Sequence, residues 1–224
     1  MTTEVLQQLL QWQSDCDVYE PALPTVFAWV LWENFGYLAR PANKFKAWKT
    51  WVNSVGIRPQ DILRVDAQTQ ESALHVGILP QNDLAKIRKA AELAMSRWQG
   101  DPDTILGLSR DQAIRALREF PSIGLPGAEK ILLFLGKYPS LAPESNGLRV
   151  LQRLGWISNL GSYSALYKRA QEFADALSED PSALQTYHRR LKFLGQTICK
   201  AKRPSCGKCP LDSFCPKAGV KADV

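Results

Sequence analysis

The chain has 224 residues, of which 45% are hydrophobic, and this composition predicts one or two globular domains and excludes a disordered tail. Its formal charge is +6 and its isoelectric point is near 9.1, which favours an acidic partner, with nucleic acid as the first candidate. No apolar run approaches the roughly 20 residues of a membrane span, and the N-terminus has no signal-peptide pattern. We therefore expect a cytoplasmic monomer without a membrane partner, associated with the nucleoid in a bacterium or archaeon.

Nearly the whole chain has a helical pattern, and alternating strand patterns are absent. Leu6, Leu9 and Trp12 predict a first amphipathic helix. The very apolar helix Val26–Asn34 is predicted to be a buried core helix. Further helices are predicted at residues 45–55, 59–64, 70–76, 83–98, 110–120, 126–135, 148–154, 164–177 and 181–198. The sequence thus predicts an all-α fold.

The middle of the chain, residues 110–136, is predicted to be a helical hairpin with the tight turn PSIG. Ser109 and Gln112 fit a capping box at its first helix. Gly124 is expected to take a positive φ in the turn. Free N–H groups of the turn and of the second helix would then face a DNA phosphate, and they belong to Ser122, Ile123, Gly124 and Gly127. The alternative is an ordinary helical hairpin with no ligand.

Four cysteines follow in the spacing C-x6-C-x2-C-x5-C, at Cys199, Cys206, Cys209 and Cys215. Soft sulfur ligands at this spacing select zinc or an iron–sulfur cluster, and the cysteines alone leave both open. Thiolates without an export signal indicate a reducing compartment. Cys16, far away in sequence, is expected to be incidental. Basic side chains expected to face phosphates surround the ligands, namely Lys200, Lys202, Arg203 and Lys208.

The order of hairpin, acidic residue in PESNGLRVLQRLG and cysteine cluster resembles the endonuclease III-like branch of the helix-hairpin-helix DNA glycosylases. The resemblance covers residues 23–216. It implies a two-domain all-α fold with a DNA-binding cleft between the domains. Residues 24–136 would form a six-helix barrel that includes the hairpin, and residues 1–23 with 137–224 would form an iron–sulfur domain. It also implies a [4Fe-4S] cluster in the loop 199–215, in a structural role.

The chain departs from the family at two positions. The lysine that forms a Schiff base in bifunctional members corresponds to Pro126, which cannot do this chemistry. Lys130 and Lys137 do not match the motif and are expected at the surface or facing phosphates, so little or no AP-lyase activity is expected. The family's catalytic aspartate corresponds to Glu144, and Asn146 matches the family's D-x-N form. Glu144 keeps a negative charge for an oxocarbenium-like sugar but is one methylene longer.

Three residues at the end of the core helix are candidates for handling a flipped base. Asn34 is the candidate for the side chain that fills the gap left by the base. Trp32 and Glu33 are candidates for the wall of the base pocket. For Trp32 the alternative is plain core packing.

These observations together predict a base-excision-repair DNA glycosylase. The expected enzyme is monofunctional and hydrolyses the N-glycosidic bond of a flipped damaged or mispaired base in double-stranded DNA. The alternatives are a catalytically weak or inactive lesion-binding protein on the same fold and a zinc-dependent DNA-binding module.

Overall fold

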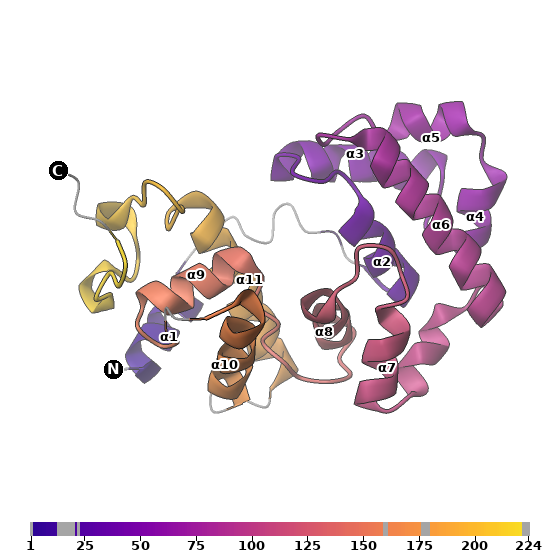
Figure 1. Ribbon diagram of the computed structural model, residues 1–224. Coiled ribbons are helices and arrows are strands. Elements are labelled where there is room, and N and C mark those ends of the chain that lie inside the picture. The colour runs from indigo at the N-terminus through magenta and orange to yellow at the C-terminus, as the bar shows by residue number, and fades with distance from the viewer. Residues whose placement is uncertain (1, 13–20, 22, 159–160, 176–179, 221–224) are drawn as a thin grey trace. The chain divides into compact units, whose positions relative to one another are not determined.

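The computed structural model describes residues 2–12, 21, 23–158, 161–175 and 180–220, and over these residues the chain forms helices and no strand (Figure 1). This is the all-α fold that the helical pattern predicts. Within the same described residues, no helix is both long enough and apolar enough to cross a membrane. Cys16 lies outside the described residues.

The chain divides into two compact units. Residues 18–135 form one, called the hairpin unit here, and residues 1–17 with 136–224 form the other, called the cysteine unit. The expected domain borders were 23/24 and 136/137. The hairpin unit contains α2 (Val26–Asn34), α3 (Pro41–Ser54), α4 (Pro59–Arg64), α5 (Ala67–Ala73), α6 (Pro80–Trp98), the 3-10 helix η2 (Pro102–Gly107), α7 (Arg110–Leu117) and α8 (Leu125–Phe134).

Helix α2 is the core helix of the hairpin unit. Every side chain of this helix except that of Glu33 is buried, and the helix packs against α6, α8 and η2. A helix that is apolar on all sides needs such neighbours around it. Two side-chain oxygens cap its N-terminus by accepting from free backbone amides. Thr25 Oγ1 accepts from the Ala28 N–H at 3.1 Å, and Asp103 Oδ1 accepts from the Val26 N–H at 2.7 Å. Asp103 thereby joins η2 to α2.

Three α-helices of this unit begin at a proline, α3 at Pro41, α4 at Pro59 and α6 at Pro80, as does the 3-10 helix η2 at Pro102. Proline suits the first helical position, because the N–H that it lacks would have no partner there. The predicted starts at residues 45 and 83 came too late, since the apolar periodicity begins only after the first turn of each helix.

Helix α5 begins three residues before the predicted start. Asp66 caps it, with Oδ1 accepting from the Thr69 N–H at 2.8 Å. Aspartate is a favoured N-cap residue because its carboxylate satisfies an otherwise unpaired amide of the first turn. The short helix η2 was not predicted. Asp101 is its N-cap residue, and the Asp101 carboxylate accepts from the Asp103 N–H.

The cysteine unit has two helices packed side by side, α9 and α11 (Figure 1). The N-terminal helix lies against α11, where the Arg190 guanidinium donates to the carbonyls of Leu9 and Leu10. The described elements of this unit are α1 (Thr2–Gln11), α9 (Ser145–Arg153), α10 (Tyr163–Asp175), α11 (Pro181–Thr197) and two 3-10 turns in the cysteine loop, η3 (Cys206–Lys208) and η4 (Asp212–Phe214).

Asp103 offers a test of how the core helix is held. Burial raises the pKa of the Asp103 carboxyl, so the folded state disfavours its ionised form. The folded protein therefore holds this proton to a higher pH than the unfolded chain does. The contribution of Asp103 to stability falls as the pH rises from the pKa of the unfolded state to that of the folded state. We expect Asp103→Ala to lower the free energy of unfolding by about 1 kcal/mol, because the Val26 N–H loses its acceptor. Asp103→Asn keeps an acceptor without the charge and should be at least as stable as the wild type at pH 7.

Urea unfolding of both variants measures these differences, with exposed Glu71→Gln as the control. The advantage of the asparagine variant over the wild type should vanish at acid pH, where the wild-type carboxyl is also neutral. Equal stability of the alanine variant and the wild type would contradict the proposed role of Asp103.

Candidate catalytic carboxylate and cysteine centre

Glu144 is the N-cap residue of α9, and both of its carboxylate oxygens accept local hydrogen bonds. Oε1 accepts from the backbone N–H groups of Asn146 at 3.0 Å and Gly147 at 3.1 Å, and Oε2 accepts from Asn146 Nδ2 at 2.8 Å. The backbone of Glu144 is extended, as is usual for an N-cap residue. The residue is half-buried. The carboxylate is therefore held against the start of its own helix.

Asn146 is in turn oriented by an arginine one turn along the helix. Its Oδ1 accepts from the Arg149 guanidinium at 2.8 Å. Arg149 also donates to the carbonyl of Gly195 at 2.7 Å and to that of Cys199 at 2.9 Å. Burial lowers the pKa of this guanidinium from its ordinary value. A continuous series of hydrogen bonds thus runs from the Glu144 carboxylate to the backbone of the first cysteine.

A second arginine of α9 holds the start of the cysteine loop. The buried Arg153 donates to the carbonyls of Lys200 at 2.8 Å and Ala201 at 2.9 Å, and to Cys199 Sγ at 3.2 Å. Its own carbonyl accepts from the Cys215 thiol at 3.3 Å. Because Cys199 and Cys215 are the first and last of the four cysteines, Arg153 contacts both ends of the loop.

All four cysteines line one pocket of about 300 Å³, part of which is open to solvent, together with Arg153. They form no disulfide with one another. Burial raises the pKa of Cys209 to about 11 and also raises that of Cys215. Backbone N–H groups oppose this, since Leu211 donates to Cys209 Sγ and Lys217 to Cys215 Sγ, each at 3.4 Å. Such N–H groups aimed at sulfur suit thiolate ligands.

Among the residues that the structure describes, no three histidine, cysteine, aspartate or glutamate side chains are arranged to hold a single metal ion. The basic side chains predicted to surround the cysteines are all exposed on the same loop, at Lys200, Lys202, Arg203 and Lys208. The loop therefore combines a common thiol pocket on its inner side with cationic groups in solvent.

The hairpin turn differs from its prediction in two ways. Ser122 takes the left-handed conformation, with a φ of 61°, whereas Gly124 has a φ of −87° and is the N-cap residue of α8. The positive φ expected at Gly124 is thus wrong, because an N-cap residue is extended. The Ile123 N–H donates to the Phe120 carbonyl at 3.2 Å, so this amide is already used within the turn.

Other amides at the start of α8 have no acceptor within the helix, which is a requirement of the predicted phosphate contact. The first bond of the helix runs from the Ala128 N–H to the Gly124 carbonyl at 2.9 Å. Amides of the first helical turn, including that of Gly127, precede this bond and have no partner within the helix. The exposed Ser122 and Gly124 lie directly before them.

Asn34 is not the exposed plug that its position suggested. Only 3% of the residue is exposed, and Nδ2 donates to the carbonyls of Val30 and Pro121, both at 2.9 Å. The side chain thus fastens the hairpin turn to α2. Because Asn34 itself is buried, its amide satisfies the carbonyl of the turn and does not reach solvent, where DNA would lie.

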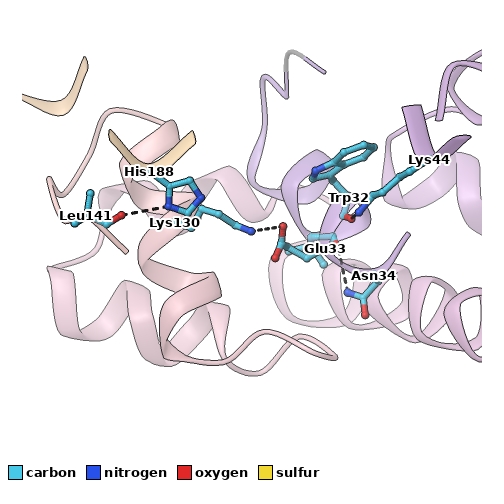
Figure 2. Close-up of polar contacts among 8 residues, drawn as sticks. Trp32, Glu33, Asn34, Lys44, Lys130, Leu141 and His188 are labelled. Atoms are coloured by element: carbon cyan, nitrogen blue, oxygen red, sulfur yellow. Dashed lines mark hydrogen bonds and ion pairs between the residues drawn. The ribbon is translucent and has the colours of Figure 1, made fainter. Parts of the chain in front are cut away.

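Trp32 packs in the core, which was the alternative considered for it. It is buried, meets Trp48 edge to face at 5.3 Å and lies under the Lys44 ammonium at 4.0 Å. Glu33 and Lys130 form an ion pair at 2.6 Å (Figure 2). Lys130 is therefore not the surface lysine that was expected, since its side chain is only 15% exposed.

The structure contains an exposed apolar surface that the sequence reasoning missed. Tyr37 and Leu38 follow α2, Ile78 and Leu79 precede α6, and all four are more than half exposed. The Ile78 N–H donates to the Tyr37 carbonyl at 3.1 Å, which holds the two segments together. We call these four residues the apolar tip. Gly36 directly precedes Tyr37 and Gly77 directly precedes Ile78, and both glycines have a positive φ. These two glycines were the sequence signal from which the two turns could have been predicted.

The chain matches no protein-family profile. Among curated proteins, endonuclease III of Bacillus subtilis (strain 168) is 27% identical over 166 residues, which cover 74% of this chain and 69% of that protein. The chloroplastic endonuclease III homolog 2 of Arabidopsis thaliana is 24% identical over 173 residues, covering 72% of this chain and 40% of that protein.

Two solved structures have the same fold. A trapped endonuclease III–DNA covalent intermediate matches with a TM-score of 0.72 at 19% identity, covering 96% of this chain and 92% of that one. A thermostable thymine-DNA glycosylase matches with a TM-score of 0.72 at 16% identity, covering 96% and 93%. At these identities the likeness establishes the shared fold.

Gly195 tests the packing that positions Asn146. A Cβ atom at this position would lie 2.5 Å from the Asn146 carbonyl oxygen. Because this oxygen belongs to the backbone of α9, it cannot move away by a change of rotamer. We expect Gly195→Ala to lower the free energy of unfolding by about 1–3 kcal/mol, because α9 and α11 must move apart. Gly107→Ala is the control, since nothing lies within 4 Å of its added Cβ. Equal stability of the two variants in urea would contradict this close packing.

Proposed function

We propose that the chain is a DNA glycosylase of base-excision repair and a divergent member of the helix-hairpin-helix superfamily, because it is similar in sequence to endonuclease III and has the same fold. It would hydrolyse the N-glycosidic bond of a damaged or mispaired base flipped out of double-stranded DNA. The observation that carries the proposal is the placement of Glu144 at the N-terminus of α9, with Asn146 and Arg149 fixing its direction.

Glu144 would act on the sugar of the flipped nucleotide. As the glycosidic bond breaks, positive charge develops on the sugar ring, and a fixed carboxylate stabilises that charge. The same carboxylate can accept a proton from the water that attacks C1′. Asn146 holds Oε2 through its amide, so that the orientation of the carboxylate does not depend on the flexible glutamate side chain alone.

We propose a hydrolytic reaction with little or no AP-lyase activity. Pro126 stands where the resemblance places the reactive lysine, and Lys130, the lysine one helical turn further along, is engaged by Glu33. An ammonium that donates to a carboxylate at 2.6 Å is a poor nucleophile until its proton has been removed.

Three surfaces would bind the DNA without reading its sequence. The free amides at the start of α8, with Ser122, Gly124 and Gly127, would donate to a phosphate. The four cations of the cysteine loop would add salt-dependent contacts with the backbone. The apolar tip, and not Asn34, would insert into the duplex where the base has left the stack. Apolar side chains inserted at a base step unstack and kink the duplex.

Cys199, Cys206, Cys209 and Cys215 would hold a [4Fe-4S] cluster that fixes the shape of the basic loop. The thiols gather around one pocket, and backbone N–H groups are directed at two of the sulfurs, as suits a set of thiolate ligands. No three of these side chains are arranged around a single ion in the described residues, so the geometry gives no support to zinc, and the resemblance to the endonuclease III-like glycosylases favours the cluster.

One observation favours a second candidate function, a catalytically weak protein that binds lesions. Both Glu144 oxygens already accept hydrogen bonds from the first turn of α9, and a longer side chain replaces the aspartate of the family. If this carboxylate cannot approach the sugar, the fold would still bind bent or abasic DNA.

The first prediction for this function concerns Glu144. We expect base release from at least one duplex in a panel that carries uracil, mismatched thymine, oxidised or alkylated bases, detected by mass spectrometry. Glu144→Gln should slow the release by about 100-fold or more, because it removes the charge while keeping the shape. Glu144→Asp keeps the charge and serves as the comparison. Tight binding of abasic DNA with no base release from any duplex would instead establish the second candidate function.

The second prediction concerns the cysteines. Protein purified without oxygen should be brown and contain iron and acid-labile sulfide in equal amounts. Cys209→Ser should lose the iron and weaken binding of abasic DNA, with a shallower dependence on salt, because the basic loop loses its shape. Ser205→Ala, beside the ligands, should change neither property. A colourless protein that contains zinc would refute the cluster.

A further inference from the structure

The ion pair between Glu33 and Lys130 joins the end of α2 to the hairpin helix α8 (Figure 2). Lys130 Nζ donates to Glu33 Oε1 at 2.6 Å, and the two side chains are 15% and 21% exposed, respectively. Glu33 is the one residue of α2 whose side chain is not buried. The pair thus forms a small charged edge on an otherwise apolar helix.

Stability alone explains this pair poorly. Removing two charges from water costs several kcal/mol per ion, and an apolar pair of similar volume often gives an equal or better stability. Apart from Asn34, the other positions of α2 are apolar, so an apolar pair would suit this place. The exposed pair Arg88–Glu92 on α6 has no such cost, since both side chains are more than half exposed. Unlike Glu129, which is only 2% exposed in its pair with Arg110, both Glu33 and Lys130 keep part of their surface in contact with solvent, so a ligand can reach both charges.

The chemistry of the pair matches one kind of base edge. A lysine ammonium has three donors, of which the contact with Glu33 uses one, and a carboxylate is an acceptor with two oxygens. Side by side they present a donor next to an acceptor. A ring N–H flanked by carbonyl groups, as in uracil and thymine, is complementary to both. Cytosine held in the same register would place an acceptor nitrogen against the carboxylate, and its amine donor lies one position further along the edge.

We propose that Glu33 and Lys130 read the edge of the flipped base and favour bases with a ring N–H beside a carbonyl. This inference rests on the proposed glycosylase function for the presence of a flipped base. Lys130 lies one helical turn after Pro126, the position at which the resemblance places contact with the sugar, so a base attached to that sugar could reach the pair. Glu33 would accept from the ring N–H and Lys130 would donate to the carbonyl.

The test measures binding, so it does not depend on catalysis. Duplexes carry 2′-fluorinated deoxyuridine or deoxycytidine, whose fluorine opposes the positive charge needed for cleavage, or an abasic analogue. Each nucleotide stands opposite a second abasic analogue, so neither base loses a pairing partner on flipping. Dissociation constants are measured for the wild type, Glu33→Gln, Lys130→Met and the double variant. The exposed pair supplies the control, Glu92→Gln.

We expect the wild type and the control to prefer uracil over cytosine by about 10-fold or more, as one charged hydrogen bond would give. Each variant of the pair should lose most of this preference while binding the abasic duplex as the wild type does. An unchanged preference in the variants, or no preference in the wild type, overturns the inference. Equal weakening on all three duplexes also overturns it, since that result means a structural role.

Two further measurements separate the ways in which the test could fail. Thermal unfolding identifies any variant that does not fold, and Lys130→Arg, which keeps the charge and a donor, should retain part of the preference. If the wild type discriminates between the bases but releases none from cleavable DNA, the base-reading inference stands and the proposed enzymatic function fails.

Discussion

The cysteine unit depends on two arginines that lie one helical turn apart on α9. Arg149 and Arg153 together donate to the carbonyls of Gly195, Cys199, Lys200 and Ala201, at the end of α11 and the start of the cysteine loop. The last carbonyls of a helix have no partner within it. Planar guanidinium groups with several donors satisfy a group of such carbonyls better than a lysine could. The two side chains thus fix α9, the end of α11 and the first cysteine as one assembly.

This arrangement gives the candidate carboxylate a direction that glutamate by itself would lack. Glutamate is not among the favoured N-cap residues, because its longer side chain has to fold back to reach the first amides. In this chain it does so, and Asn146 takes the second oxygen, with Arg149 behind it. Gly195 allows the backbones of α9 and α11 to approach closely enough for the Arg149 contact. The departure from aspartate is thus accompanied by neighbours that hold the longer side chain.

Much of the fold could be predicted from the sequence because helical periodicity is a local property. The limits of α2 and α4 agree with their predictions, whereas α3 and α6 begin earlier, at Pro41 and Pro80. Proline at the first helical position is itself a sequence signal, so these starts could have been found. The resemblance, drawn from cysteine spacing and motif order, also pointed to the right fold, which solved structures under 20% identical share. The roles of Asn34 and Lys130 could not be predicted, because they depend on partners far away in sequence, Pro121 and Glu33, and no periodicity records which polar residue meets which partner.

The charges of this protein serve two different physical purposes. Those on the cysteine loop are exposed, so each contributes little to folding, and under the proposed function they would act through the phosphate backbone, with a strength that salt controls. The pair Glu33–Lys130 and Arg153 of α9 are largely removed from water, where an unsatisfied charge is costly and direction matters. Exposed charge can hold the protein on any duplex, since phosphates are the same everywhere. Only the buried groups have the fixed geometry that can distinguish one base, or one reacting sugar, from another.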